Sequence, residues 1–304
     1  MSIQITTAMV QQYRDNVYHL SQQKGSRLRS AVRVEMVNGT SAFYEQIGST
    51  AARRRTSRHA DTPRMDTPHT RRRVTLSDFD WADLIDNEDQ VRMLINPSSQ
   101  YAEAAAYAMG RAMDDEIIAA AVGTAYTGET GATSTSYDSA NMTVAITVTW
   151  PGVSSACAGL NVAKILEAKK CLGAQNVDPD DECYMLVNAR QIKSLLMDTR
   201  ISSADFNAVK PLVDGQVSRF GGFQMIPTER IPLNGSVDRV IYWAKGGVLL
   251  GLGRDIQVRV GERADKNYAT QVFCAMSIGA TRMEEARVGS ILCDIDAGPE
   301  GNLD

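Results

Sequence analysis

Arginine is concentrated in one stretch of this sequence, AARRRTSRHADTPRMDTPHTRRR, which covers residues 51–73. The stretch contains two histidines, two aspartates and no lysine. A guanidinium group stays charged and offers five donors in a planar fork, so it can bind a carboxylate through two parallel hydrogen bonds. The residue types therefore predict ion pairing with acidic groups. The eight arginines are Arg53, Arg54, Arg55, Arg58, Arg64, Arg71, Arg72 and Arg73.

The rest of the chain is acidic, which makes the arginine-rich stretch exceptional. The formal net charge of the 304 residues is −4. The stretch contributes +6, as eight arginines less two aspartates, so the remaining residues sum to −10. A basic patch can also bind nucleic acid, but this one has no aromatic residue on which bases could stack. Three interpretations stay open: contact with a neighbouring subunit, contact with nucleic acid, and a solvated loop.

The motifs of common enzymes and cofactor sites are missing from the sequence. There is no phosphate-binding GxxxxGK[ST], no HExxH, no GxSxG and no GxGxxG, and no histidine follows His69. The five cysteines have no CxxC spacing, so they predict reduced thiols rather than a zinc site. Asp114 and Asp115 are neighbours on a predicted helix and point about 100° apart, so they do not converge on one substrate atom. We expect no catalytic residue, no cofactor and no metal.

The elements around the arginines predict a projecting loop. Strand-like segments precede and follow the stretch, whereas Pro63 and Pro68 disfavour helix and central strand within it. Roughly 20 irregular residues are unusual inside a compact domain, unless the loop has a role outside its own subunit. No apolar run reaches the roughly 18 residues that a membrane-spanning helix needs, and the first residues do not resemble a secretory signal.

A long helix is predicted over residues 97–122, after a capping Asn96 and before Gly123. Its apolar residues recur at spacings of three and four and so share one face. We expect this face to be closely packed, such that Ala106→Leu would overpack it. The residues of this face are Ala102, Ala106, Met109, Met113 and Ile117, followed by Ala120.

The second half of the chain mixes helices and strands. Helices are predicted at 161–173 and 189–198, with Asn188 and Gln191 as a capping box at the start of the second. A buried strand is predicted at 181–188, and alternating apolar residues predict strands near 255–260 and 271–280. The fold class is therefore α+β.

This order of elements resembles the major capsid proteins of tailed bacteriophages with the Hong Kong 97-type fold. The resemblance begins with the short strand and the arginine-rich loop. It continues through the long helix in LIDNEDQVRMLINPSSQYAEAAAYAMGRAMDDEIIAAAVG and extends over roughly residues 35–295. It implies the following division: an N-terminal arm at 1–40, an extended E-loop at 41–77, a peripheral domain at 78–149 and 251–304 with a spine helix at about 97–122, and an axial domain at 150–250.

The resemblance implies a structural coat protein that self-assembles into the icosahedral head enclosing the DNA genome. The implied partners are copies of the chain in hexamers and pentamers, a separate scaffolding protein, a portal protein, a decoration protein in some relatives, and packaged DNA bound without sequence specificity. Assembly would occur in the bacterial cytoplasm, with no membrane involved. The alternatives are an encapsulin-like compartment shell and a nucleic-acid-binding protein.

The resemblance also gives the arginines a role. Some family members join neighbours covalently through a loop lysine, but this chain has no lysine between Lys24 and Lys164. We therefore expect the loop arginines to hold an adjacent subunit through noncovalent ion pairs, and we expect a lone subunit with Arg71, Arg72 and Arg73 all changed to glutamate to fold. The candidate acidic partners on that subunit are Asp78, Asp80, Asp83, Asp86, Glu88 and Asp89.

Overall fold

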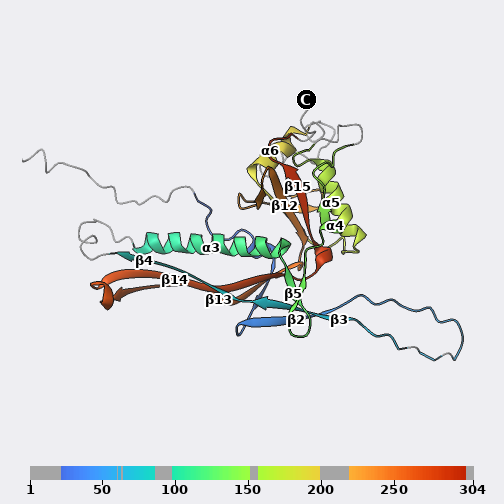
Figure 1. Ribbon diagram of the computed structural model, residues 1–304, viewed down its shortest axis with the longest axis horizontal. Helices are drawn as coiled ribbons and strands as arrows, with labels where there is room; N and C mark the ends of the chain where they lie inside the picture. Colours follow the sequence, from blue (N-terminus) through green and yellow to red (C-terminus); the bar gives the residue numbers. More distant parts are fainter. Residues whose placement is uncertain are drawn as a thin grey trace, which may run out of the picture. The chain divides into compact units, whose positions relative to one another are not determined.

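A computed structural model describes residues 22–59, 61–62, 64–85, 98–150, 157–198 and 219–298. These residues form helices and strands in a mixed α+β arrangement, as predicted (Figure 1). The backbone divides into two compact units, each of which is described by itself. Unit 1 comprises Met1–Ser26, Asp78–Ala112 and Arg254–Ser277, and unit 2 comprises Arg27–Ser77, Met113–Gly253 and Ile278–Asp304.

The longest helix, α3, covers Ser98–Val122 and confirms the predicted helix at 97–122. It ends where predicted, since the Gly123 amide donates to the Ala119 carbonyl at 2.8 Å. Within unit 1, the chain near Gly25 lies against Gly110, where an added Cβ would be 2.5 Å from the Gly25 carbonyl carbon. The helix surface there is thus shaped for direct backbone contact.

A four-stranded sheet has the order β1-β13-β14-β4, and unit 1 contains the part of β4 from Asp78, the part of β13 from Arg254 and the part of β14 up to Ser277. Strand β14 alternates as the sequence predicted, because Val272, Cys274 and Met276 are buried and the residues between them are half-buried. This apolar face supplies much of the core of unit 1. The strands of the sheet are β1 (Arg33–Met36), β4 (Ser77–Ile85), β13 (Val248–Arg263) and β14 (Ala269–Arg282).

A seven-stranded sheet forms the centre of unit 2, with the order β7-β15-β12-β8-β10-β9 and β11 paired to β12. All five residues of β8 are buried, as expected for a central strand. The strands are β7 (Thr143–Val144), β8 (Cys183–Val187), β9 (Arg219–Phe220), β10 (Phe223–Pro227), β11 (Leu233–Asn234), β12 (Val237–Ala244) and β15 (Val288–Asp294). The helical segments other than α3 in the described residues are α4 (Ser139–Met142), α5 (Val162–Ala174), α6 (Ala189–Met197), η1 (Arg29–Ala31), η2 (Ala264–Lys266) and η3 (Glu285–Arg287).

The predicted capping box at the start of α6 is only half formed. Asn188 caps the helix, because its Oδ1 accepts from the Gln191 amide at 2.9 Å. The Gln191 side chain does not return the contact; it donates to Asp238 at 2.8 Å and accepts from the Leu160 amide at 2.9 Å. The Leu160 amide thus occupies Oε1, the atom that would otherwise accept from the Asn188 amide, and sequence spacing cannot reveal this partner.

A second sheet of unit 2 has the order β2-β3-β5-β6 and carries the arginine-rich stretch. Tyr44 packs against a cluster of Val74, Leu249 and Met283, so one face of this sheet is covered by the unit. The approach is close, since a Cβ added at Gly279 would lie 2.0 Å from the Thr75 carbonyl oxygen. The strands are β2 (Ser41–Ile47), β3 (His69–Thr75), β5 (Ala125–Thr127) and β6 (Thr133–Thr135).

No helix in the described ranges is both long and apolar enough to cross a membrane.

Candidate intersubunit contact site

The predicted loop is an extended segment, residues 48–68, between two paired strands. Strands β2 and β3 are antiparallel, and their register sets Glu45 opposite Arg71 and Phe43 opposite Arg73. The neck of the segment is closed by a hydrogen bond from the Gly48 amide to the Pro68 carbonyl at 2.8 Å. Every described residue from 48 to 68 is exposed, so the segment does not pack on its own subunit.

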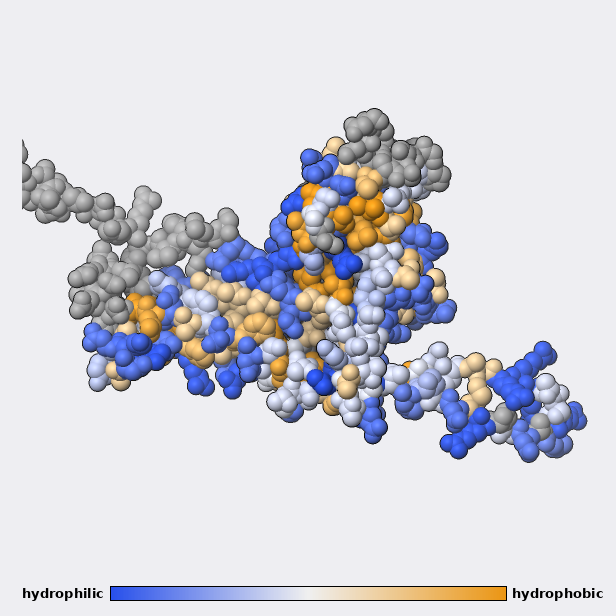
Figure 2. Space-filling model, in the orientation of Figure 1, coloured by the Kyte–Doolittle hydropathy of each residue, from blue (hydrophilic) through white to orange (hydrophobic). Residues whose placement is uncertain are grey.

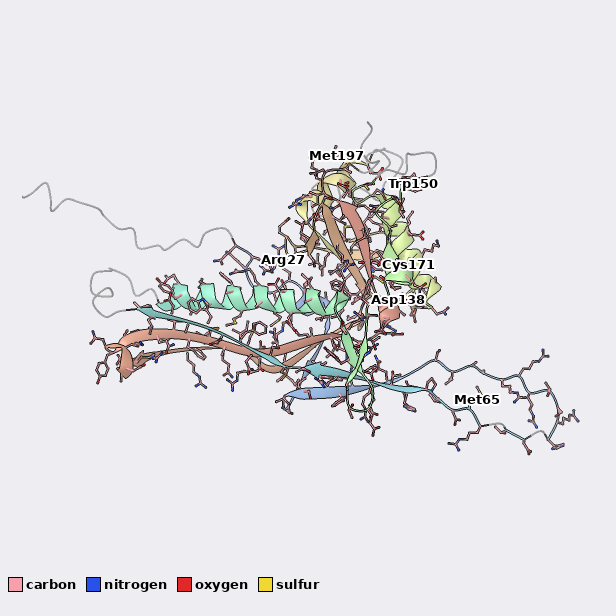
Figure 3. The ribbon with its side chains drawn as sticks, in the orientation of Figure 1. Arg27, Met65, Asp138, Trp150, Cys171 and Met197 are labelled. Carbon is pink, nitrogen blue, oxygen red and sulfur yellow. The ribbon has the colours of Figure 1, made fainter. Side chains whose placement is uncertain are left out.

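The tip arginines, which we define as Arg53, Arg54, Arg55, Arg58 and Arg64, are all exposed. Their recorded contacts are local: Arg55 Nε donates to the Ser57 carbonyl at 3.0 Å, and Arg64 lies 3.3 Å from Asp66. The segment is largely hydrophilic in Figure 2. Figure 3 shows the side chains of this segment, including the labelled Met65, extending away from its backbone. The tip arginines are therefore presented to solvent and to other molecules.

The root arginines Arg71 and Arg73 already have partners in their own chain. Arg71 forms an ion pair with Glu45 at 2.7 Å, and its guanidinium lies 5.9 Å from the centroid of the Phe43 ring. Arg73 lies over the Tyr126 ring at 5.6 Å and donates to the Gly131 carbonyl at 3.3 Å. Exposed pairs of this kind contribute about 0–1 kcal/mol each. Arg71 and Arg73 are thus held by contacts within the chain, and both side chains stay half-buried.

Arg72 does not fit the predicted role of a contact with a neighbour. Alternation along β3 turns it to the covered face of the sheet, where its side chain is 7% exposed. Its Nε donates to the Met283 carbonyl at 2.9 Å, and one Nη donates to both Glu285 oxygens, at 2.6 Å to Oε1. Arg72 is thus an internal anchor, and it is not available to an adjacent subunit in this conformation.

Sequence reasoning missed Arg282, which shares the same carboxylate. Its side chain is fully buried, and Nε lies 3.5 Å from Glu285 Oε1. Burial lowers the pKa of the Arg282 guanidinium, and the neighbouring Glu285 opposes that effect. The alternation of buried residues along β14 ends at Ile278, so the sequence pattern gave no signal for the burial of Arg282.

The predicted acidic partners lie on or after β4, in unit 1. Asp78 and Asp80 are exposed, and Asp83 is half-buried with its carboxylate accepting from the Leu84 amide at 2.8 Å. Asp78 and Asp80 are therefore accessible from the solvent. The remaining three candidates, Asp86, Glu88 and Asp89, lie outside the described residues.

The predicted apolar face of α3 is only partly buried within the subunit. Met109, Met113 and Ile117 are buried, but Ala102 and Ala106 are only half-buried. The fully buried alanine of the first turns is Ala105, at 0% exposure. Several alanines follow one another there, so spacing alone does not distinguish which of them faces the core.

The paired acids of α3 have structural partners instead of a shared substrate site. Asp114 is fully buried and accepts from the backbone amides of Arg27 at 3.1 Å and Leu28 at 3.2 Å. Asp115 pairs with the guanidinium of Arg230 through both oxygens. Both carboxylates therefore tie α3 to other segments of unit 2. Within the described ranges, no three His, Cys, Asp or Glu side chains are grouped as metal ligands would be.

Ala105→Leu is expected to lower the free energy of unfolding of the lone subunit by about 1–3 kcal/mol, because added methylenes must displace a packed core. The neighbouring change Ala106→Leu adds the same atoms at a half-buried position and should cost less than about 0.5 kcal/mol. Urea unfolding of both variants measures the difference. Equal destabilisation by the two changes would contradict the assignment of Ala105 as the packed residue.

The described architecture is that of known phage shell subunits. Similar structures include the capsid protein of cyanophage P-SCSP1u, with 14% identity, a TM-score of 0.72 and coverage of 94% of each chain. The capsid of Ralstonia phage GP4 matches with 12% identity, a TM-score of 0.71 and coverage of 97% of each chain. The head of Helicobacter pylori bacteriophage KHP40 matches with 10% identity, a TM-score of 0.71 and coverage of 97% of this chain and 99% of that one. The fold is thus the Hong Kong 97-type fold.

The protein family is identified from the sequence itself. Residues 5–295 match the family described as phage capsid protein. The chain therefore belongs to the phage capsid protein family and is a structural coat protein of a bacteriophage. No curated protein sequence matches it significantly.

Proposed function

We propose that the chain is the major capsid protein of a tailed bacteriophage, and that its copies assemble as hexamers and pentamers into the icosahedral head that encloses the DNA genome. One observation supports the proposal beyond family membership: a segment at 48–68 leaves the sheet, and all of its described residues are exposed. Ordering roughly 20 residues costs conformational entropy, which contacts with another subunit can offset.

The proposed division of the chain follows from the resemblance. The E-loop is 41–77, the peripheral domain is 78–149 and 251–304, and the axial domain is 150–250. The tip arginines then hold a neighbouring copy by pairing with its β4 acids, of which Asp78 and Asp80 are exposed. Each exposed pair contributes about 0–1 kcal/mol, so stability comes from the repetition of the contact around a closed shell.

The proposed partners are a separate scaffolding protein, a portal protein, packaged DNA bound without sequence specificity, and a decoration protein if the head uses one. Assembly takes place in the host cytoplasm. The role is structural and requires no catalytic residue and no cofactor.

An encapsulin-like compartment shell is the second candidate, because it would use the same fold. Membership of the phage capsid protein family favours the virion. A nucleic-acid-binding role for the loop is the third candidate, and the lack of an aromatic residue between 51 and 73 weighs against it.

Electron microscopy of particles purified from infected cells tests the proposal. We expect closed icosahedral particles that contain this chain as their main protein and DNA in their interior. Particles of this chain filled with a cargo enzyme and free of DNA would favour the compartment shell. A chain that stays monomeric in the presence of the phage's other head proteins would contradict both shell functions.

A further inference from the structure

Two buried arginines meet one carboxylate at the root of the loop. Arg72 and Arg282 have side-chain exposures of 7% and 0%, and Glu285 between them is 27% exposed. Arg72 binds both oxygens of the carboxylate, whereas Arg282 approaches one of them at 3.5 Å. All three belong to unit 2. The cluster therefore places two cations around one anion in a largely desolvated position.

Each arginine holds a different element. Arg72 lies in β3, the strand that receives the chain from the loop, and also binds the Met283 carbonyl. Arg282 donates to the carbonyls of Ala121 at 3.1 Å and Gly123 at 2.7 Å, at the end of α3. Glu285 thus connects the strand at the base of the loop to the C-terminal end of α3.

The cluster is not a simple source of stability. Arg72 Nη1 and Arg282 Nε are buried, and no hydrogen-bond partner for either atom is found in the described part of the chain. A buried donor without a partner is unfavourable. Buried ion pairs often stabilise no better than apolar packing, but their directional hydrogen bonds can fix one arrangement of the elements they join. We therefore attribute these buried charges to the positioning of the elements they join and not to stabilisation of the fold.

We propose that Glu285, together with Arg72 and Arg282, is a positioning joint that fixes the direction in which the loop leaves unit 2, and thereby the angle between neighbouring subunits and the diameter of the shell. This proposal rests on the proposed function, because the loop must reach a neighbour for its direction to affect the shell. The planar guanidinium of Arg72 supplies the directionality, because it is held at two points: Nε donates to the Met283 carbonyl, and one Nη donates to both Glu285 oxygens.

Glu285→Asp is the decisive variant, because it keeps the charge and shortens the reach of the carboxylate by one methylene. Glu284→Asp is the matched control, because Glu284 is 53% exposed and pairs with Arg287 at 2.9 Å. Each full-length variant is expressed with the other head proteins, and particle diameters are measured by electron microscopy. We expect Glu285→Asp to lose closed shells of wild-type diameter, and Glu284→Asp to retain them.

Arg72→Lys is a second test of the joint, should Glu285→Asp fail to fold. Lysine keeps the positive charge but lacks the planar guanidinium. Amide hydrogen exchange of β2 and β3 in the unassembled chain gives a readout that does not depend on shells. We expect faster exchange there in Glu285→Asp and Arg72→Lys than in Glu284→Asp. The proposed joint would be disproved if soluble Glu285→Asp and Arg72→Lys gave shells of wild-type diameter and wild-type exchange rates. A wild-type chain that forms no shells would instead overturn the proposed function, and the exchange rates would still decide on the joint.

Discussion

Arg72→Glu is expected to prevent stable folding of the lone subunit. The new carboxylate would face Glu285 on the covered side of β3 and leave the fully buried Arg282 with a disturbed partner. Breaking a buried pair by removing one partner costs about 3–5 kcal/mol, which is a large part of the roughly 5–15 kcal/mol that stabilises a typical domain. The yield of soluble chain and its urea unfolding curve measure the effect.

Arg71→Glu is the matched control, one residue away on the exposed face of the same strand. Its ion pair with Glu45 is exposed, so its loss should cost no more than about 1 kcal/mol. If the two variants unfold at the same urea concentration, the internal role of Arg72 is wrong. A subunit with Arg71, Arg72 and Arg73 all changed to glutamate is therefore not expected to fold, contrary to the expectation from the sequence, and such a variant cannot test the contact with a neighbour.

The elements of the fold were the most predictable part of the molecule, because each depends on local pattern. The long helix was predicted as 97–122 and covers Ser98–Val122, since a regular apolar period and a terminal glycine define it without tertiary information. The strands β2 and β3 were predicted from short alternating flanks around a proline-containing middle. The helix and each of the two strands are thus recognised from a short run of consecutive residues, as helix and strand patterns generally are.

The separate roles of the arginines could not be predicted, because they depend on residues distant in sequence. Alternation along β3 implies that Arg72 differs from its two neighbours, but not which face is covered. That choice depends on Met283 and Glu285, which lie more than 200 positions further along the chain. Similarly, spacing could not separate Ala105 from Ala106 within a run of alanines. The neighbour contacts of the tip arginines remain a prediction.

Changing Arg53, Arg54 and Arg55 together to glutamate is expected to abolish shell assembly and leave the subunit folded. The three residues are exposed and belong to a segment that packs on nothing in its own unit, so the free energy of unfolding should change by less than about 0.5 kcal/mol. In the assembled shell, the new carboxylates would face the acids of a neighbouring β4, and the repulsion would recur at every copy of the contact. Unfolding curves and electron microscopy of the same preparation separate the two effects.

Two further measurements identify what the tip arginines bind. Lysine at the same three positions keeps the charge but loses the bidentate fork, so assembly should weaken less than with glutamate. Wild-type assembly should also weaken as salt rises, because the Debye length falls from about 10 Å at 0.1 M to about 3 Å at 1 M. If the loop binds the genome instead, the glutamate variant will form empty shells normally and fail only to package DNA. Normal empty shells from that variant would therefore disprove the contact between the tip arginines and a neighbouring subunit.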